Sequence, residues 1–445
     1  MKTEVIRAII ERNQLEIAQH QGVKREIEDL IYAEVSASPI KLINGFRRAG
    51  KSYLLKSLIQ RATQQGCFKL ANVLYLNFED LQLDEINTAQ KLNDFYQAFI
   101  ESRSKEEPKI LAFDEIQNVD KWDKFIRTIY ETNKRDAIFI TGSNSELLSS
   151  ELGTNLAGRF IQFSLQPFSF SEYINYHSSI SNKSTKELLL NNQLERERLL
   201  DGYLRYGGLP ETFSITNDLT RHNYVQGIVS KVILDDIVKR FGLRNITALE
   251  KIFQYLCLNV GTVISYTKIT KRLNQLGIKV EDDTVIQYIS HLEKSFAVYE
   301  VAKFDWTTRK VFQGTKKYYT IDTALPNLYN RLTADTSRLL ENLVYLKLRS
   351  NSETKYIYYS NDGKFEIDFI TESWSGTLSK YQVTTELNDE NYDRELGAFI
   401  TNDRHLAKCP NIILTRKGQS QELKYNKTKV KQINLIEWLL LSQLA

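Results

Sequence analysis

Cysteine and histidine are scarce in this chain. Its 445 residues include three cysteines and five histidines. Cys67, Cys257 and Cys409 lie far apart and match no metal-binding or redox spacing, and the histidines form no metal cluster. The sequence therefore excludes a metal or redox site built from these residues. We predict that the three thiols are buried in a protein of the reducing cytoplasm.

Long apolar runs are absent as well. No run is long enough to span a bilayer, and the start, Met1-Lys2-Thr3-Glu4, is not that of a secretory signal. The charge is nearly balanced, with 59 Lys and Arg against 55 Asp and Glu, for a net charge of +4. This balance permits contact with nucleic acid without demanding it. We expect a cytoplasmic protein of two to four domains that has no membrane partner.

The most informative motif runs from Gly45 to Ser52 and reads G-F-R-R-A-G-K-S. It matches the pattern G-x-x-x-x-G-K-[ST] of a phosphate-binding loop. In such a loop backbone N–H groups surround a pyrophosphate, Lys51 reaches the outer phosphates, and the Ser52 hydroxyl binds Mg²⁺. A β-prone run at 40–44 precedes the motif and an amphipathic helical pattern at 53–59 follows it, which is the context that the loop requires.

A second motif supplies acids at the end of another strand. The apolar run 109–113 leads into Asp114 and Glu115, some 60 residues after the loop. Asp114 would hold Mg²⁺ through water, and Glu115 would polarise the attacking water. An apolar run followed by two acids can also be an ordinary strand that enters a loop. Both motifs in this order predict a nucleotide-binding site.

Strands and helices alternate through the first 215 residues. Further strands are predicted at 73–78, 137–142 and 160–163, and helices over 5–30 carry Lys24 and Arg25 just before the sheet. Alternation of this kind predicts a parallel sheet that is covered on both faces. Ligands of such sheets bind at the carboxyl ends of the strands.

Two more residues extend the predicted site. Ser143 follows the fourth strand and could hydrogen-bond the γ-phosphate or the attacking water, or it could simply cap the next helix. Arg159 precedes the fifth strand. It could stabilise charge on a γ-phosphate bound by a neighbouring subunit, or it could form a surface ion pair.

These motifs together resemble the AAA+ superfamily of P-loop ATPases. More closely, the chain resembles a prokaryotic group of AAA-family ATP-binding proteins that have a C-terminal domain of unknown function. Ser143 matches the position called sensor 1, and Gly158-Arg159-Phe160 resembles the motif that carries the arginine finger. The resemblance implies that the turn 208–210 lies near the adenine, and a simple turn between two helices is compatible with that role. It runs over nearly the whole chain and is carried by 45–52, Asn77-Phe78-Glu79-Asp80, Phe113-Asp114-Glu115-Ile116-Gln117, Thr141-Gly142-Ser143-Asn144 and Tyr206-Gly207-Gly208-Leu209-Pro210-Glu211.

The motifs and the resemblance define a set of candidate site residues, with ATP and Mg²⁺ as cofactors and a homo-oligomer as the expected assembly. The candidate catalytic residues are Lys51, Glu115, Ser143 and Arg159. The candidate nucleotide-binding residues are Gly45, Arg48, Ala49, Gly50, Lys51, Ser52 and Tyr53. The candidate Mg²⁺-binding residues are Ser52 and Asp114.

The middle region reads as three helices followed by a β-hairpin, the order of a winged helix-turn-helix. The helices are predicted at 249–258, 266–273 and 283–295, and the strands at 297–301 and 317–321. The third helix begins with acids at 281–283, which would repel phosphate. Basic residues lie on the second helix and in the wing, so contact with a DNA backbone and service as a lid or interaction module both stay open. They are Lys268, Lys271, Arg272, Arg309, Lys310, Lys316 and Lys317.

The C-terminal region resembles a restriction-endonuclease-like fold in its order α-β-β-β-α-β. In active members, an acid on the first helix, an acid on the second strand and a Glu-x-Lys motif gather Mg²⁺. Glu341 and Asp368 match the two acids, although they could also be ordinary acids on the helix surface and at the strand edge. Gln382-Val383-Thr384 stands where Glu-x-Lys is expected, and a neutral amide is a poor Mg²⁺ ligand. We therefore predict a nuclease-like domain that has lost, or nearly lost, cleavage.

The whole sequence predicts an α/β protein with three parts. An AAA+-like P-loop ATPase domain with the start of a helical lid is expected at 1–215, the lid and winged helix at 216–330, and the degenerate nuclease-like domain at 331–445. The predicted function is ATP hydrolysis that drives or gates a conformational change, with DNA as a candidate target. Two alternatives are a slow nucleotide switch that binds a protein or DNA, and a Mg²⁺-dependent DNA nuclease.

Overall fold

The computed structural model describes residues 1–101, 103–104, 106–143, 156–181, 193–304, 315–329, 336–361, 363–400, 406 and 408–444. The chain divides into two compact units. The first holds residues 1–166, and the second holds nearly all of residues 167–445.

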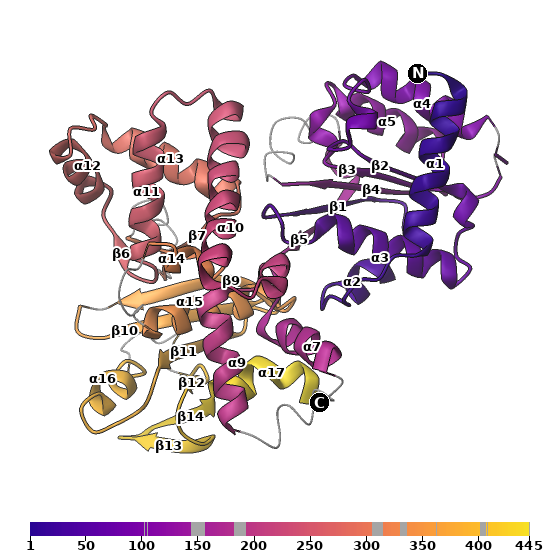
Figure 1. Ribbon diagram of the computed structural model, residues 1–445. Helices are drawn as coiled ribbons and strands as arrows, with labels where there is room; N and C mark the ends of the chain where they lie inside the picture. The colour runs from indigo at the N-terminus through magenta and orange to yellow at the C-terminus, as the bar shows by residue number, and fades with distance from the viewer. Residues whose placement is uncertain are drawn as a thin grey trace. The chain divides into compact units, whose positions relative to one another are not determined.

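The first unit is a parallel five-stranded sheet with helices on both faces. The strand order is β2-β3-β4-β1-β5, and every pair is parallel. Figure 1 shows α2 and α3 on one face of this sheet and α4 and α5 on the other. The elements are α1 (Thr3–Ala18), α2 (Glu28–Ala33), β1 (Ile40–Gly45), α3 (Lys51–Gln64), η1 (Leu70–Asn72), β2 (Val73–Asn77), η2 (Leu81–Leu83), α4 (Ala89–Ile100), β3 (Ile110–Asp114), η3 (Ile116–Asn118), α5 (Trp122–Thr132), β4 (Ala137–Gly142) and β5 (Phe160–Leu165).

The three central strands of this sheet are buried on both faces. Every residue of β1, β3 and β4 is buried. Such continuous burial explains why these strands read as apolar runs rather than as alternating patterns. Apolar side chains of α1, α4 and α5 pack on one face and form its core. The predicted α/β class, with a parallel sheet, is confirmed.

The strand register brings the predicted motifs together at the carboxyl ends of the strands. Asn44 pairs with Gly142, and Asn77 pairs with Asp114. The carboxyl ends of β1, β2, β3 and β4 therefore lie side by side. The phosphate-binding loop leaves the sheet at the same edge as the acids, which is where ligands of open parallel sheets bind.

The second unit is built on a mixed nine-stranded sheet. Its order is β13-β14-β12-β11-β10-β9-β7-β8-β6. The elements are α7 (Phe170–Ser181), α9 (Gln193–Tyr206), η5 (Pro210–Ser214), α10 (Asp218–Lys231), the π-helix η6 (Val232–Lys239), α11 (Ile246–Leu258), β6 (Val263–Ile264), α12 (Tyr266–Gln275), α13 (Asp282–Lys294), β7 (Val298–Lys303), β8 (Lys316–Thr320), α14 (Ala324–Asn327), α15 (Thr336–Ser350), β9 (Thr354–Asn361), β10 (Glu366–Ser373), β11 (Leu378–Thr384), α16 (Tyr392–Gly397), β12 (Asn411–Thr415), β13 (Gln421–Tyr425), β14 (Thr428–Asn434) and α17 (Leu435–Leu444).

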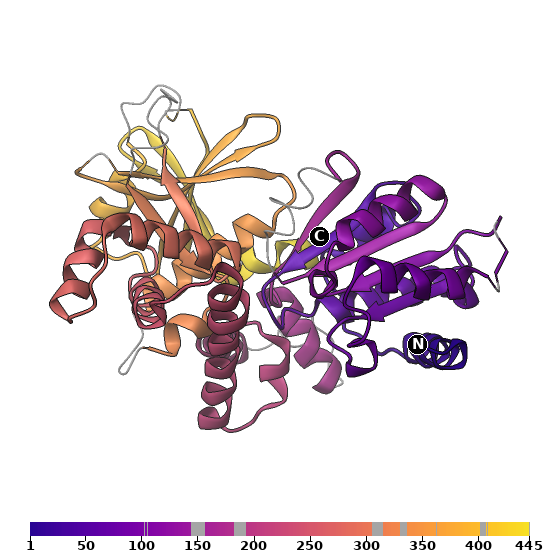
Figure 2. The same ribbon diagram turned by 90° about the horizontal axis from the view of Figure 1, so that it is seen from above.

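One sheet runs through the hairpin of the middle region and the C-terminal strands. β7 pairs antiparallel with β8 and parallel with β9, so the hairpin continues the C-terminal sheet. Figure 2 shows the orange and yellow strands of this sheet fanning out, as strand twist requires. The three helices expected before the hairpin are present as α11, α12 and α13.

The cysteine prediction is wrong in part. Cys257 is buried, but Cys67 is exposed and Cys409 is partly buried. Cys67 lies in the turn after α3, where the chain passes over the surface, so its apolar side chain finds no core to enter. Among the described helices, none has both the length and the apolar character that crossing a membrane requires.

Candidate functional site

The phosphate-binding loop joins β1 to α3. A Cβ on Gly45 would lie 2.1 Å from the carbonyl oxygen of Leu165, so only glycine fits where the loop leaves the sheet. Gly50 caps α3 with a φ of 98°, and no side chain caps this end of the helix. The first backbone N–H groups of α3 are therefore open to an anion, an arrangement suited to phosphate.

Lys51 reaches back across the loop. Its ammonium donates to the carbonyl oxygens of Gly45 and Phe46, at 3.2 and 3.4 Å. It also lies 3.4 Å from Oε1 of Glu115, and its side chain is only 5% exposed. A phosphate that entered the loop would compete with Glu115 for this ammonium.

Asp114 is fully buried at the end of β3, within reach of three hydroxyl groups. Thr141 donates to its Oδ1, Tyr75 donates to its Oδ2 at 2.8 Å, and Ser52 hydrogen-bonds the same carboxylate. Burial raises the pKa of Asp114, the charge of Glu115 raises it further, and the three hydroxyls lower it without cancelling the rise. A carboxylate next to a serine hydroxyl offers the oxygen ligands that Mg²⁺ prefers.

Glu115 lies next to Asp114 in the left-handed conformation, with a φ of 52°. Its backbone N–H donates to Oγ1 of Thr141 at 3.0 Å, and Gln117 donates to its carboxylate at 2.5 Å. Burial raises the pKa of Glu115, but the charge of Lys51 and the Gln117 hydrogen bond outweigh burial and leave the pKa below its ordinary value. Glu115 is therefore ionised at neutral pH, as a general base must be. Backbone strain of this kind concentrates at functional sites.

Two of the predicted binding residues turn their side chains outward. Arg48 is exposed and has a φ of 66°. Tyr53 is 64% exposed, and its ring centroid lies 5.3 Å from that of His20. The neighbouring Arg47 instead forms an ion pair of 2.9 Å with Glu79, after β2.

Ser143 follows β4 and is 2% exposed. Because β4 lies between β3 and β1, Ser143 shares the sheet edge of Asp114 and Gly45. This position is compatible with both predicted roles, the phosphate contact and the helix cap. Asn144, which completes the motif, lies outside the described residues.

Arg159 lies at the amino end of β5, whereas the phosphate-binding loop lies at the carboxyl ends of the strands. In the parallel pair of β1 and β5, Ile40 is opposite Phe160 and Gly45 is opposite Leu165. Arg159 is therefore separated from the loop by the length of β5, about 17 Å at ~3.3 Å per residue. Its guanidinium forms an ion pair of 3.0 Å with Glu131. Both predicted roles are compatible with this place, but Arg159 does not lie at the phosphate edge of its own chain.

Arg25 is a contact residue that the sequence did not single out. Its buried guanidinium donates to the carbonyl oxygen of Ala49 at 3.0 Å and to that of Gln166 at 2.7 Å. The two hydrogen bonds tie the phosphate-binding loop to the chain that follows β5. The partners are 24 and 141 residues away along the sequence, so no local pattern could have paired them.

Thr141 was also missed, although it stands in a quoted motif. Ser143 was the predicted polar residue of that motif, yet the hydroxyl of Thr141 contacts both Asp114 and the backbone of Glu115. A signal existed in the sequence. A polar residue within the otherwise apolar end of the fourth strand must find a partner in the core, and the nearest candidates were the acids of the neighbouring strand.

The glycine turn predicted to lie near the adenine is built around Asp322 within the second unit. Gly208 donates its N–H to Asp322 at 2.7 Å, and a Cβ on Gly207 would lie 1.7 Å from Oδ1 of Asp322. This contact gives the two glycines a structural reason. Proximity to an adenine stays a prediction.

The C-terminal acids predicted from the nuclease resemblance lie close together. Gln382 accepts the backbone N–H of Asp368 at 3.2 Å and donates to Glu395 at 2.9 Å, while Glu341 adds its charge to Asp368. No group of three or more His, Cys, Asp or Glu within the described ranges is arranged to hold a metal ion.

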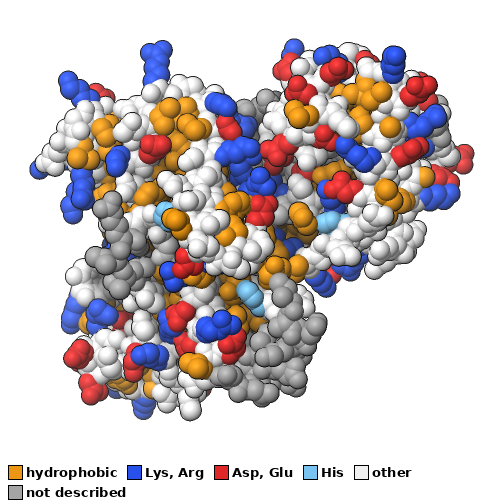
Figure 3. All heavy atoms as spheres, in the orientation of Figure 1, with side chains coloured by type: hydrophobic (Ala, Val, Ile, Leu, Met, Phe, Trp, Pro, Cys, Tyr) orange, Lys and Arg blue, Asp and Glu red, His pale blue; other side chains and the backbone are white. Residues whose placement is uncertain are grey.

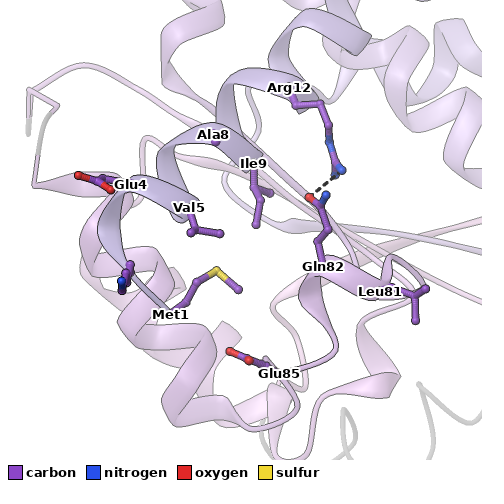
Figure 4. Close-up of a pocket in the computed structure, with 10 residues that line it drawn as sticks. Met1, Glu4, Val5, Ala8, Ile9, Arg12, Leu81, Gln82 and Glu85 are labelled. Carbon is purple, nitrogen blue, oxygen red and sulfur yellow. Dashed lines mark hydrogen bonds between the residues drawn. The ribbon is translucent and has the colours of Figure 1, made fainter.

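A separate hollow lies between α1 and η2, with a volume of about 850 Å³. Figure 4 shows Val5 and Ile9 pointing into it from α1, with the Arg12–Gln82 hydrogen bond of 2.8 Å at its side. None of the residues that line it belongs to the predicted phosphate-binding set. It is therefore distinct from the phosphate-binding loop.

Family models match two parts of the chain. Residues 37–174 match an AAA domain, and residues 197–336 match a domain of unknown function (DUF8612). Among solved structures, the Walker-type ATPase PABY2304 of Pyrococcus abyssi is similar, with 14% identity, 70% of this chain and 99% of that chain covered, and a TM-score of 0.48.

Two relatives match most of the chain. The uncharacterized protein MJ1544 of Methanocaldococcus jannaschii is 29% identical over 393 residues, which cover 86% of this chain and 82% of that protein. An uncharacterized protein of Haemophilus influenzae is 30% identical over 410 residues, which cover 90% of this chain and 94% of that protein. The AAA domain supports a nucleotide-dependent ATPase activity. The chain belongs to the same family as the Haemophilus influenzae protein, and it carries an AAA domain at residues 37–174.

Proposed function

We propose that this protein is an ATPase of the AAA+ type, which binds ATP with Mg²⁺ at residues 45–53 and hydrolyses it. One observation carries the proposal: Lys51, Asp114 and Glu115 meet at the edge of the sheet where the uncapped end of α3 also lies. The residues present fit the metal, because Ser52 and Asp114 already contact each other through oxygen atoms. Bound Mg²⁺ would neutralise charge on the phosphates.

The residues of the site divide the chemistry between them. Lys51 would leave Glu115 and bind the outer phosphates of ATP, helped by the N–H groups at the start of α3. Glu115, freed from that ion pair, would orient the attacking water and accept its proton. Thr141 would hold both acids in place, and Ser143 would hydrogen-bond the γ-phosphate or the water.

Arg159 is proposed to act on ATP bound by a neighbouring copy of the chain. Its place at the opposite edge of the sheet supports action in trans, because it is too far from the loop of its own chain to act there. To do so, it would have to exchange Glu131 for a phosphate. That ion pair is half-exposed, and exposed ion pairs contribute little to stability, so the exchange would cost little.

Glu115→Gln tests the proposed base directly. Gln keeps the shape of the side chain and loses the charge, so ATP should still bind while turnover falls by two to four orders of magnitude. The matched control is Glu107→Gln, an acid of the same unit that pairs with Lys69 outside the proposed site. Wild-type turnover in Glu115→Gln, measured as phosphate release, would remove Glu115 from the reaction.

A slow nucleotide switch is the second candidate. The observation in its favour is that a single chain has no Arg159 at its own phosphate edge. Turnover measured against protein concentration separates the two candidates. A rate per subunit that rises steeply with concentration supports the ATPase, and a flat, negligible rate supports the switch.

DNA is proposed as a partner of the middle region, read as a winged helix. Lys268, Lys271 and Arg272 are exposed on α12, and Figure 3 shows blue side chains along the outer edge of the molecule near this helix. α13 instead begins with Asp282 and Asp283. Contact with the phosphate backbone through α12 is therefore better supported than base reading by α13. Arg309 and Lys310 of the predicted wing lie outside the described residues.

The proposed parts of the chain keep the boundaries 1–215, 216–330 and 331–445.

DNA binding through α12 should weaken when Lys268 and Lys271 are changed to Glu, and the slope of affinity against salt should become shallower. Gel-shift or anisotropy measurements at several salt concentrations provide the readout. Unchanged affinity and slope would remove α12 from the proposal.

A further inference from the structure

A lysine occupies the centre of the acidic cluster in the second unit. Lys317 lies on β8, and its side chain is fully buried. Its ammonium lies 2.5 Å from Oε1 of Glu366 and 3.2 Å from Oε1 of Glu341. Tyr319, two residues further along β8, donates its hydroxyl to the same oxygen of Glu341 at 2.5 Å. One strand thus supplies two hydrogen-bond donors to the carboxylates.

The charges in this cluster depend on one another. Burial lowers the pKa of Lys317, but the carboxylates of Glu341, Asp368 and Glu366 outweigh burial and raise it above its ordinary value. The ammonium is therefore charged at any physiological pH. Burial raises the pKa of Asp368, and Glu341 raises it further. The lysine is the cation that lets these acids remain in a buried place.

A divalent metal ion does not fit the same cluster. Glu341 Oε1 is engaged by two donors, and Asp368 Oδ2 accepts the backbone N–H of Val383 at 2.8 Å. Gln382 is neutral, and its amide is engaged on both sides. Mg²⁺ needs near-octahedral oxygen ligands at about 2.0–2.1 Å, and the oxygens named above already accept N–H and O–H groups of the chain. The metal that a nuclease fold implies is therefore inconsistent with the residues present.

We propose that the ammonium of Lys317 takes the place of a divalent cation in the C-terminal domain. Its single charge then offsets part of the negative charge of Glu341, Glu366 and Asp368 from within the chain, and the domain neither binds Mg²⁺ nor cleaves DNA. The inference goes beyond the proposed ATPase and does not depend on it.

The lysine has a mechanical consequence as well. It comes from the hairpin β7–β8, whereas its partners lie on α15 and β10. The ion pairs therefore fasten the hairpin of the middle region to the C-terminal helix and sheet. A metal ion held by Glu341 and Asp368 alone would make no such connection. With lysine in place of a metal ion, the cluster connects the hairpin to the C-terminal helix and sheet and does not act as a reaction centre.

The first test is Mn²⁺ titration of the nucleotide-free protein, followed by electron paramagnetic resonance. We expect wild type and Asp368→Asn to bind Mn²⁺ equally weakly. We expect Lys317→Ala to gain about one tighter Mn²⁺ per chain, because three carboxylates then lack their cation, and Lys317→Ala with Asp368→Asn to lose it. Lys316→Ala is the matched control, since the neighbouring Lys316 pairs with Glu300 instead and should change nothing.

Two results would overturn the proposal. One is Mn²⁺ binding by the wild type that Asp368→Asn abolishes, or Mn²⁺-dependent DNA nicking with the same dependence, because either would mean that lysine and metal coexist. The other is a folded Lys317→Ala that binds no additional Mn²⁺. If Lys317→Ala does not fold, the comparison of wild type with Asp368→Asn still decides whether the native domain uses a metal.

Discussion

At the scale of the residue, the site depends on side chains that hold the acids as much as on the acids themselves. The hydroxyl of Thr141 donates to Asp114 and accepts from the backbone N–H of Glu115. It thereby fixes the proposed metal ligand relative to the proposed base. Pre-organisation of this kind is worth a large part of a catalytic effect, because misplacement of a base by ~1 Å can cost about 100-fold in rate.

Thr141→Val removes this hydroxyl and keeps the shape of the side chain. We expect ATP turnover to fall roughly ten-fold or more, and the free energy of unfolding to fall by about 1–3 kcal/mol because buried polar groups lose a partner. Steady-state turnover and urea unfolding measure the two effects. Thr141→Ser, which keeps the hydroxyl, should retain most of both. Equal turnover of Thr141→Val and wild type would show that the hydroxyl does not position the acids for reaction.

The sequence patterns identified the candidate residues that belong to contiguous motifs. They missed the residues whose partners are distant in the sequence. The spacing within 45–52, and the two acids after an apolar run, were visible because each motif is contiguous. Arg25 and Lys317 were noted only as basic residues. Lys317 meets its acids across 24 and 49 residues, through a sheet order that no local pattern encodes.

At the scale of the element, strand ends and turns decide where chemistry is placed. The edges of β3 and β4 carry the acids and Thr141, and their boundaries were predicted to within a residue because buried parallel strands are uninterrupted apolar runs. β13 and β14 were not predicted. Their sequences are rich in Lys and Gln, and none of the residues of β13 and only two of those of β14 are buried, so alternation of apolar and polar residues is too weak to reveal them.

Asp322 accepts the N–H of Gly208 in the turn between α9 and η5, and its burial leads to a prediction about how stability depends on pH. Burial raises the pKa of Asp322 to about 7, although backbone N–H groups of Ala324 and Gly208 lower it. Between the unfolded value of about 3.9 and about 7, the folded chain holds a proton that the unfolded chain has lost. The contribution of Asp322 to stability is therefore present at low pH and is lost as the pH rises through this window.

Asp322→Asn cannot ionise, so it should remove this part of the pH dependence. We expect the urea midpoint of wild type, relative to that of Asp322→Asn, to decline as the pH is raised from about 5 to about 8. Asn lacks one of the acceptor oxygens of Asp, but this loss is the same at every pH and does not affect how the difference between the two midpoints changes with pH. If the urea midpoints of the two proteins change with pH in the same way, Asp322 has an ordinary pKa in the folded chain.

At the scale of the whole molecule, the proposed role of Arg159 would require more than one chain. Arg159 and the phosphate-binding loop lie at opposite edges of the same sheet. A subunit that offers its loop to one neighbour and Arg159 to another would complete every site in a closed assembly. The activity would then depend on assembly rather than on nucleotide binding alone.

Mixing two inactive variants tests this arrangement. Arg159→Ala has an intact loop, and Lys51→Ala has an intact Arg159. Each alone should be nearly inactive, and a mixture should regain a measurable fraction of wild-type turnover, because loops from one variant meet arginines from the other. A mixture no more active than the sum of its parts would mean that Arg159 does not serve a neighbouring site.

The most direct test of the central claim is ATP binding and turnover in Lys51→Ala beside a control on the same helix. Lys56 of α3 pairs with Glu16 and lies outside the loop, so Lys56→Ala is that control. Calorimetric titration and phosphate release should show at least a ten-fold loss of both ATP affinity and turnover for Lys51→Ala, and near wild-type values for Lys56→Ala. If Lys51→Ala binds and hydrolyses ATP as wild type does, the residues gathered at this sheet edge are not an ATPase site.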